Sequence, residues 1–122
     1  LEAALRTAYH TVTGENPEID EQSPLKVLRQ IGSFKELEID IKGVKLHCAA
    51  LSSLGEARRL IQAMKRGECH YDFVEVMACP GGCIGGGGNP PKTWSIMEKR
   101  KKAIYEAEAE LPVRQSHKNP AI

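Results

Sequence analysis

Hydrophobic and polar residues alternate most regularly between residues 36 and 48. The apolar positions are Leu37, Ile39 and Ile41 in the first half of this stretch and Val44, Leu46 and Cys48 in the second half. Strict alternation is typical of a strand with one face on the core and the other in water. Lys42-Gly43, between the two halves, fits a two-residue hairpin turn. We therefore predict a β-hairpin, with Cys48 as a small buried hydrophobe and His47 in solvent.

Three other stretches repeat their apolar residues at helical spacing. These stripes are Leu1, Ala4, Leu5, Ala8 and Val12; Leu54, Ala57, Leu60, Ile61 and Met64; and Trp94, Met97, Ile104, Ala107 and Leu111. Gly14 ends the first helix, and Ser53 with Glu56 forms a capping box at the second. The third helix runs from about residue 93 to residue 111, before Pro112. Each stripe is expected to be buried. The basic run 99–102 is expected to face water; the alternative is that it forms a docking patch for an acidic partner.

The remaining stretches complete the predicted fold. Residues 15–33 are polar and contain two prolines, which indicates a loop, with either one or two helical turns or an extended run after Ser23. The segment from Tyr71 to Ala78 is nearly continuous in apolar residues, as in a strand covered on both faces. We predict a single α/β domain over residues 1–122. Its small sheet has three to four strands, including the hairpin, and is flanked by helices; residues 112–122 form an extended tail.

Composition excludes some kinds of partner. The 122 residues are 41% hydrophobic and 27% charged, with a net charge of +1. A nearly neutral chain gives no electrostatic reason to bind nucleic acid. No apolar run approaches the ~20 residues that cross a bilayer. We expect neither a nucleic-acid nor a membrane partner, and a cytoplasmic protein, with the periplasm as the alternative.

The stretch from Val76 to Pro90 carries the candidate chemistry. It contains Cys79 and Cys83, four positions apart, and four consecutive glycines at 85–88. Glycines let the backbone approach a large group without a Cβ clash, and their amides can point at an anion. Because the preceding strand delivers the chain into this loop, we expect a site at the carboxyl end of the sheet.

Several kinds of cysteine site compete. Two disulfides would use all four cysteines, the others being Cys48 and Cys69, but nothing in the sequence indicates a secreted protein. Structural zinc prefers Cys-x-x-Cys pairs and four ligands. A phosphate loop would end in Gly-Lys-Ser/Thr, and a bacterial ferredoxin motif would repeat Cys-x-x-Cys. Cys69 lies beside His70 without further ligand types nearby. The best chemical interpretation is an iron–sulfur cluster completed by cysteines from outside this chain.

The loop resembles a known family motif. Residues 75–90, EVMACPGGCIGGGGNP, are similar to the last of the three cysteine motifs of the FeFe-hydrogenases. That motif usually has glutamine at the position of Asn89 and often asparagine at the position of Gly85. Residues 2–9 and 114–120 also resemble the C-terminal region of that family, so the resemblance covers nearly the whole chain.

The resemblance implies a specific cofactor, the H-cluster, which is a 4Fe-4S cubane joined through a cysteine sulfur to a two-iron subcluster. By motif position, Cys79 is expected to ligate the cubane, and Cys83 is expected to be the bridging thiolate at the catalytic centre. Met77 is expected beside the two-iron unit, and Pro80, Gly81 and Gly82 are expected around the cofactor. The family reaction is the reversible formation of hydrogen from two protons and two electrons.

The resemblance also implies that the site is incomplete. The other two cluster cysteines belong to two earlier motifs of the family, Thr-Ser-Cys-Cys-Pro and Met-Pro-Cys, which this sequence lacks. We expect the chain to be the C-terminal lobe of a larger catalytic domain, partnered by the rest of that domain and by ferredoxin or a similar electron carrier, and inactive alone. Leu1 already lies within a helical stripe, which fits either a piece of a longer protein or a processed terminus. The alternatives are a non-catalytic iron–sulfur assembly or scaffold protein and an apo α/β interaction domain.

Overall fold

The computed structural model describes residues 1–17, 23–30, 32–91 and 93–121. Its helices are α1 (Glu2–Thr13), α2 (Leu54–Lys65) and α3 (Trp94–Glu110), and its strands are β1 (Phe34–Ile41), β2 (Val44–Ser52) and β3 (Phe73–Met77). The described residues also form three 3₁₀-helices, η1 (Pro24–Arg29), η2 (Cys83–Gly85) and η3 (Ser116–Lys118). These elements confirm the predicted α/β fold. Positions 18–22 and 31 of the predicted loop lie outside the described residues.

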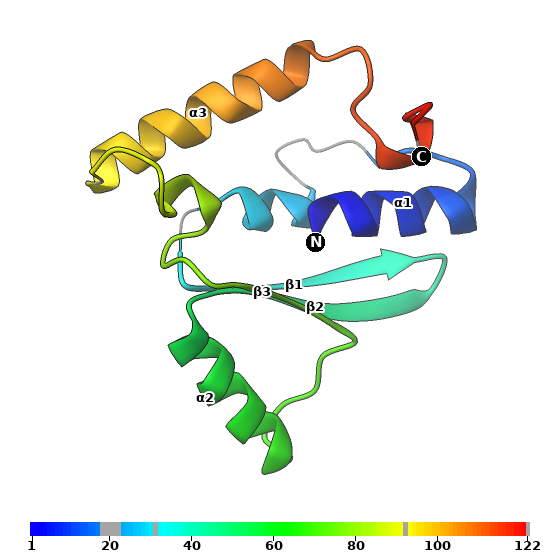
Figure 1. Cartoon of the computed structure of the whole chain (residues 1–122). Coiled ribbons are helices and arrows are strands. Elements are labelled where there is room, and N and C mark those ends of the chain that lie inside the picture. Colours follow the sequence, from blue (N-terminus) through cyan, green and yellow to red (C-terminus); the bar gives the residue numbers. More distant parts are fainter. Residues whose placement is uncertain (18–22, 31, 92, 122) are drawn as a thin grey trace.

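The strands form one sheet in the order β1-β2-β3, with β2 antiparallel to β1 and parallel to β3. Between β2 and β3 the chain crosses through α2, as a parallel pair requires. Figure 1 shows α2 on one side of the sheet and α1 and α3 on the other. The loop that follows β3 lies at the edge of the sheet and leads into α3, so the sheet and α3 together position the cysteines.

The hairpin is confirmed in detail. Lys42 and Gly43 both have positive φ, 54° and 86°, which is the geometry of a type I′ turn. Asp40 Oδ1 accepts a 2.7 Å hydrogen bond from the Gly43 amide and closes the turn. Cys48 is fully buried, and this burial raises the pKa of its thiol. His47 lies on the wet face, with Nε2 3.0 Å from a Glu38 carboxylate oxygen.

Each face of the sheet has its own buried cluster. One cluster lies under α1 and η1 and contains Leu5, Leu25, Leu37, Ile39, Ile41 and Cys48. The other lies under α2 and contains Leu51, Ala57 and Leu60. The Ser53 hydroxyl accepts the Glu56 amide at 3.3 Å, so the predicted cap at the start of α2 is present. Burial of each leucine-sized side chain contributes about 1.5–3 kcal/mol to this small core.

Many apolar residues of the predicted stripes are exposed, and their predicted burial was wrong. They are Ala4, Val12, Val44, Leu54, Ile61, Met64, Trp94, Ile104, Ala107 and Leu111. Helical spacing gives the face on which a side chain lies, but burial also requires another element over that face. In α3 only Met97 is buried, because the remainder of its stripe has no described element packed closely over it.

Strand β3 was predicted to be covered on both faces, as strands in the interior of an α/β sheet are, and it instead lies at the edge of the described sheet. Among the described strands it pairs only with β2. Phe73 and Val76 are 46% and 48% exposed, so the expectation of cover on both faces was also wrong. A run of apolar residues cannot by itself distinguish an interior strand from an edge strand, since both can be equally hydrophobic.

The two connecting segments contain short helical turns. Residues after Ser23 form η1, which decides against the extended alternative, although the Ser23 side chain makes no capping hydrogen bond. The tail, expected to be extended, contains η3, where His117 stacks on His10 of α1 with ring centroids 4.0 Å apart. The end of the described chain is therefore packed against its beginning.

Candidate functional site

The cysteine loop begins where β3 ends and runs through η2 to α3. Ser53 donates its amide to the Met77 carbonyl at 2.8 Å, which fixes the start of the loop against the end of β2. Cys79 is half-buried and Cys83 is exposed, and both are free thiols. Cys48 and Cys69 are also free and lie with the two core clusters, so the disulfide alternative was wrong.

The loop turns sharply after Cys79. The Gly82 amide donates to the Cys79 carbonyl at 3.0 Å, with Pro80 and Gly81 as the central residues. Gly81 has a φ of 81°, so this turn has the sequence and the positive φ of a type II turn. Gly82 also has a positive φ, 87°. Glycine is required at both positions because other residues rarely adopt this backbone conformation.

Three glycines also leave room for sulfur-containing side chains. A Cβ on Gly81 would collide with the terminal methyl of Met97, and one on Gly82 would lie 3.5 Å from Met77 Sδ. A Cβ on Gly86 would lie 3.2 Å from Cys79 Sγ. The backbone therefore passes close to the sulfur atoms of the loop, as the glycine content predicted.

The glycine amides are not all available to a ligand. Gly85 donates to the Gly82 carbonyl and Gly86 to the Cys83 carbonyl, each at 3.0 Å. These bonds form η2 and satisfy the two amides within the loop. From the sequence, the glycine amides could point at an anion, and for Gly85 and Gly86 this was wrong.

Side chains hold the second half of the loop. Asn89 Nδ2 donates to the Cys83 and Gly86 carbonyls at 3.4 and 3.2 Å. Arg100 of α3 donates to the Ile84 and Pro90 carbonyls, both at 2.9 Å. The expectation that Arg100 simply faces water was wrong. Its position three residues after Met97, on the same helical face, is the sequence signal that could have identified it.

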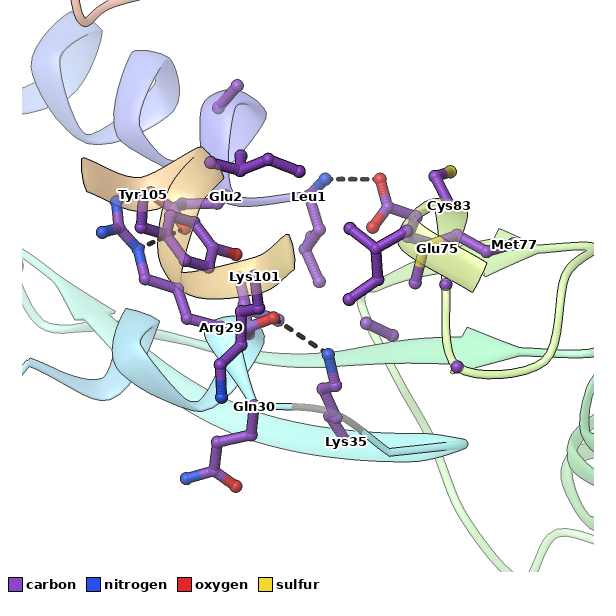
Figure 2. Close-up of a pocket in the computed structure, with 17 residues that line it drawn as sticks. Leu1, Glu2, Arg29, Gln30, Lys35, Glu75, Met77, Cys83, Lys101 and Tyr105 are labelled. Carbon is purple, nitrogen blue, oxygen red and sulfur yellow. Dashed lines mark hydrogen bonds and ion pairs between the residues drawn. The ribbon is translucent and has the colours of Figure 1, made fainter. Parts of the chain in front are cut away.

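A cavity of about 300 Å³ opens beside Cys83. Figure 2 shows Cys83, Met77 and Glu75 on one side of it and Glu2, Arg29 and Tyr105 on the other. Lys35 also lines the cavity and donates to the Leu28 carbonyl at 2.9 Å; burial lowers the pKa of this lysine. Burial likewise raises the pKa of Tyr105, whose ring lies 4.3 Å from the Arg29 guanidinium.

The predicted cofactor-binding residues divide between two hollows. Met77, Gly81, Gly82 and Cys83 line the cavity just described. Pro80 lines a second hollow, together with Gly81, Trp94 and Met97. Cys79 lines neither and instead lies under Gly86. The two thiols thus have different surroundings, one partly covered and one open.

The part of the chain that the structure describes offers no third ligand. It contains no group of three or more histidine, cysteine or acidic side chains that could hold a metal ion. Two thiols are fewer than the four cysteines that usually hold an iron–sulfur cluster, so a cluster at this loop would need ligands from other residues. None of the described helices is long and apolar enough to cross a membrane.

Comparison with protein families gives two matches. Residues 1–87 match the C-terminal domain of the iron-only hydrogenase large subunit, and this match includes both cysteines of the loop. The chain belongs to the iron-only hydrogenase family. Residues 95–122, which comprise most of α3 and the tail, match the iron hydrogenase small subunit. The chain thus combines segments similar to two subunits.

Relatives of the chain include two kinds of protein. It is 38% identical over its whole length to the NADP-reducing hydrogenase subunit HndD of Solidesulfovibrio fructosivorans, covering 20% of that protein. It is also 38% identical over 72% of its length to the cytosolic Fe-S cluster assembly factor narfl of Xenopus tropicalis, covering 18% of that factor. The chain therefore spans about a fifth of the length of these two relatives.

A solved structure extends the likeness to three dimensions. A variant of the [FeFe]-hydrogenase HydA1 from Chlamydomonas reinhardtii aligns with 98% of the chain at a TM-score of 0.74 and 34% identity. The aligned region is 37% of that structure. The fold described above is thus that of the C-terminal part of a hydrogenase catalytic domain, as predicted.

The residues present fit the cofactor that this family implies. Iron–sulfur clusters are held by cysteine thiolates, and the loop presents two free thiols. Glycine at 82 and 86 keeps side chains away from the sulfur atoms of Met77 and Cys79. The two thiols have the right chemistry for half of a four-cysteine cluster site, with two further ligands from residues outside the chain.

Proposed function

We propose that this chain supplies Cys79 and Cys83 to the H-cluster of an iron-only hydrogenase, with the other two cluster cysteines coming from residues outside the chain. The observation that carries the proposal is the cysteine loop itself. It holds two free thiols on a glycine-shaped turn, and no third ligand is grouped with them among the described residues. The partner is therefore the remainder of the hydrogenase catalytic domain.

The surroundings of the two thiols support different roles. Cys79, half-buried beneath Gly86, is assigned as a ligand of the 4Fe-4S cubane. Cys83, exposed at the mouth of the cavity, is assigned as the bridging thiolate to the two-iron subcluster. Met77 lines the same cavity and supplies apolar cover, while Pro80, Gly81 and Gly82 form the turn that separates the two ligands.

When bound, the cluster supplies the redox chemistry that interconverts two protons and two electrons with hydrogen. The chain's own residues bind the cluster, orient it and limit the access of water. Cys79 and Cys83 must be thiolates to act as ligands. The turn at Gly81 and Gly82 directs the two sulfurs, and Met77 covers one side of the space beside Cys83. Electrons are delivered by ferredoxin or a similar carrier.

A second candidate function comes from the likeness to the cluster assembly factor narfl. In that case the loop would hold an iron–sulfur cluster without hydrogen chemistry. The alignment with HndD covers the whole chain and that with narfl covers 72% of it, which favours a hydrogenase. The sequence preceding this chain in its gene separates the two, because only a hydrogenase carries the Thr-Ser-Cys-Cys-Pro and Met-Pro-Cys motifs.

The direct test uses the complete protein that contains this chain, purified without oxygen. Iron and sulfide per molecule and hydrogen evolution from a reduced viologen dye are measured for the wild type, Cys79→Ser and Cys83→Ser. Cys69→Ser is the matched control, because Cys69 is a free thiol outside the loop that packs against the α2 cluster. We expect both loop variants to lose iron and hydrogen evolution and the control to retain them.

The other outcomes distinguish the candidates. Iron content unchanged in both loop variants contradicts ligation by this loop. Iron that depends on both cysteines, in a wild-type protein that evolves no hydrogen, favours the assembly function. The chain produced alone is expected to hold no complete H-cluster and to evolve no hydrogen; full activity of the isolated chain would contradict the proposal of a shared site.

A further inference from the structure

Arg100 of α3 bonds to both ends of the glycine run. Its Nη1 donates to the Ile84 carbonyl and its Nη2 to the Pro90 carbonyl, each at 2.9 Å. These two carbonyls bracket the four glycines at 85–88. A guanidinium with a fixed fork of donors can satisfy two acceptors at once, and hydrogen bonds from a charged donor are stronger than neutral ones.

The loop needs such external support because of its composition. Glycine loses more backbone entropy on ordering than any other residue, and the losses of four consecutive glycines add up. Within the loop, Asn89 ties its own side chain to the Cys83 and Gly86 carbonyls. These bonds are longer than those of Arg100, at 3.4 and 3.2 Å. The hydrogen bonds from Arg100 are therefore shorter than those from Asn89, and their donor is charged.

Arg100 differs from the other basic residues of its run. Lys101 pairs with Glu98, and Lys102 lies 3.6 Å from Glu106, as is common on helix surfaces. No ion pair of Arg100 is found within the described part of the chain, and its contacts are to loop carbonyls. One turn earlier, the buried Met97 packs against Gly81. The first turns of α3 thus contact the loop near its beginning and at its end.

The two partners of this contact belong to segments that match different family models. The turn that carries Cys79 and Cys83 lies within residues 1–87, the large-subunit match, whereas Arg100 lies within residues 95–122, the small-subunit match. The shape of the loop therefore depends on a side chain from outside the segment that supplies the ligands.

We infer that Arg100 is a positioning residue: through it, α3 holds the cysteine loop in shape before the cluster binds. The inference rests on the proposed function only for the identity of the group that the loop binds, an iron–sulfur cluster. The order of the loop is a property of the metal-free protein and is measured separately. Without Arg100 the glycine run gains alternative conformations, and Cys83 is presented in the correct position for a smaller fraction of the time.

Hydrogen–deuterium exchange tests this in the complete protein in its metal-free form. Arg100→Ala is expected to accelerate amide exchange across residues 84–89 by about tenfold or more, the factor that corresponds to losing one hydrogen bond of a charged group. Exchange in β1 and β2 is expected to stay the same. The matched control is Lys102→Ala, which removes an exposed basic side chain two residues away that pairs with Glu106 on the surface of α3.

Arg100→Lys provides a second measurement that retains the charge, the long stem and the helix propensity. A single ammonium cannot reproduce the guanidinium fork, so loop exchange is expected to accelerate in this variant too. In the iron-loaded protein, both Arg100 variants are expected to release iron to a chelator faster than Lys102→Ala. If exchange in the loop and in β2 is unchanged in Arg100→Ala, the inference is wrong. If Arg100→Ala unfolds, Arg100→Lys decides instead, and unchanged loop exchange in that variant overturns the inference.

The two proposals fail in different ways. If loop exchange does not respond to Arg100 but Cys79→Ser and Cys83→Ser abolish iron binding, the positioning role is wrong and the ligand assignment stands. If loop exchange responds to the Arg100 variants but iron binding is independent of both cysteines, the positioning role of Arg100 stands and the cluster assignment is wrong.

Discussion

Gly86 lies over the sulfur of Cys79, so closely that a Cβ built on Gly86 would be 3.2 Å from Cys79 Sγ. The same Cβ would be 3.1 Å from the Cys83 carbonyl oxygen. The backbone of Gly86 has a φ of −74° and a ψ of 173°, which any residue can adopt. The requirement for glycine here thus comes from the space next to the Cys79 thiol and the Cys83 carbonyl, and not from the backbone conformation.

Gly86→Ala is therefore a test of the space around Cys79, the proposed cluster ligand. We expect the variant to fold normally, because its backbone is unstrained, and to bind severalfold less iron in the complete protein, because the methyl group displaces Cys79 Sγ. Iron per molecule and the thermal midpoint are the measurements. The control is Gly87→Ala, since a Cβ there meets nothing within 4 Å. Equal iron content in the two variants would show that Gly86 does not limit the site.

Met97 is the buried contact between α3 and the turn that follows Cys79. It is 4% exposed and its terminal methyl occupies the space beside Gly81. Met97→Ala is expected to lower the free energy of unfolding by about 2–3 kcal/mol through loss of burial and the cavity left behind. Urea denaturation of the chain measures this. Ile96→Ala is the control, because Ile96 is 37% exposed and should cost clearly less; equal losses would contradict the assigned role of Met97.

The elements whose signals are local were predictable from sequence. The hairpin needed only the alternation around Lys42-Gly43 and a turn that accepts positive φ. The helix cap needed only Ser53 and the residues just after it. The strand leading into the cysteine loop was also predicted, because hydrophobic runs and turn residues are read over a few neighbouring positions.

What depended on distant packing was not predictable. Trp94 is 68% exposed although it begins an apolar helical stripe, since no described element covers it closely. Arg100 was grouped with the lysines around it, and its bonds to Ile84 and Pro90 follow only from where α3 lies against the loop. The motif indicates residues only within its own few positions, whereas the residues that support the loop from outside required the structure.

Glu108 joins the tail and α3 to the start of the chain. Its carboxylate accepts from Arg114 Nε and Nη2, both at 3.1 Å, and lies 3.5 Å from Arg6 and from Arg29. Arg114 first, and then Arg29 and Arg6, hold the pKa of Glu108 below its usual range. The Arg6 side chain is only 8% exposed, so it depends on nearby carboxylates for compensation.

Glu108→Gln is expected to destabilise the chain by about 1–3 kcal/mol, because the hydrogen bonds lose their charge while the shape is kept. Because the folded pKa is lowered, the carboxylate contributes stability above its unfolded pKa of about 4.3, and this is lost as the pH falls through the lower folded value. Urea denaturation at pH 7 and at acid pH measures both effects. Glu106→Gln, at an exposed helix pair, should change stability by less than about 0.5 kcal/mol; a similar loss in both variants would contradict the role of Glu108.

The packing of the tail on α1 is expected to depend on pH through His117. Its ring stacks on His10, with its nitrogens 3.4 Å from Thr7 Oγ1 and 3.1 Å from Asn16 Oδ1. Desolvation, then His10, Lys118 and Arg6, lower the pKa of His117 in the folded chain.

A base whose folded pKa is lowered binds fewer protons when folded, so its neutral form favours the packed tail. The packing should be complete above the ordinary histidine pKa of about 6.5 and should weaken as the pH falls below it. Hydrogen–deuterium exchange of residues 112–121, corrected for intrinsic rates, should be faster at pH 5.5 than at pH 7.5. His117→Gln should remove this difference, whereas His70→Gln, at an exposed histidine distant in sequence from the tail, should retain it. A tail whose corrected exchange is equal at the two pH values would show that the histidine stack does not control its packing.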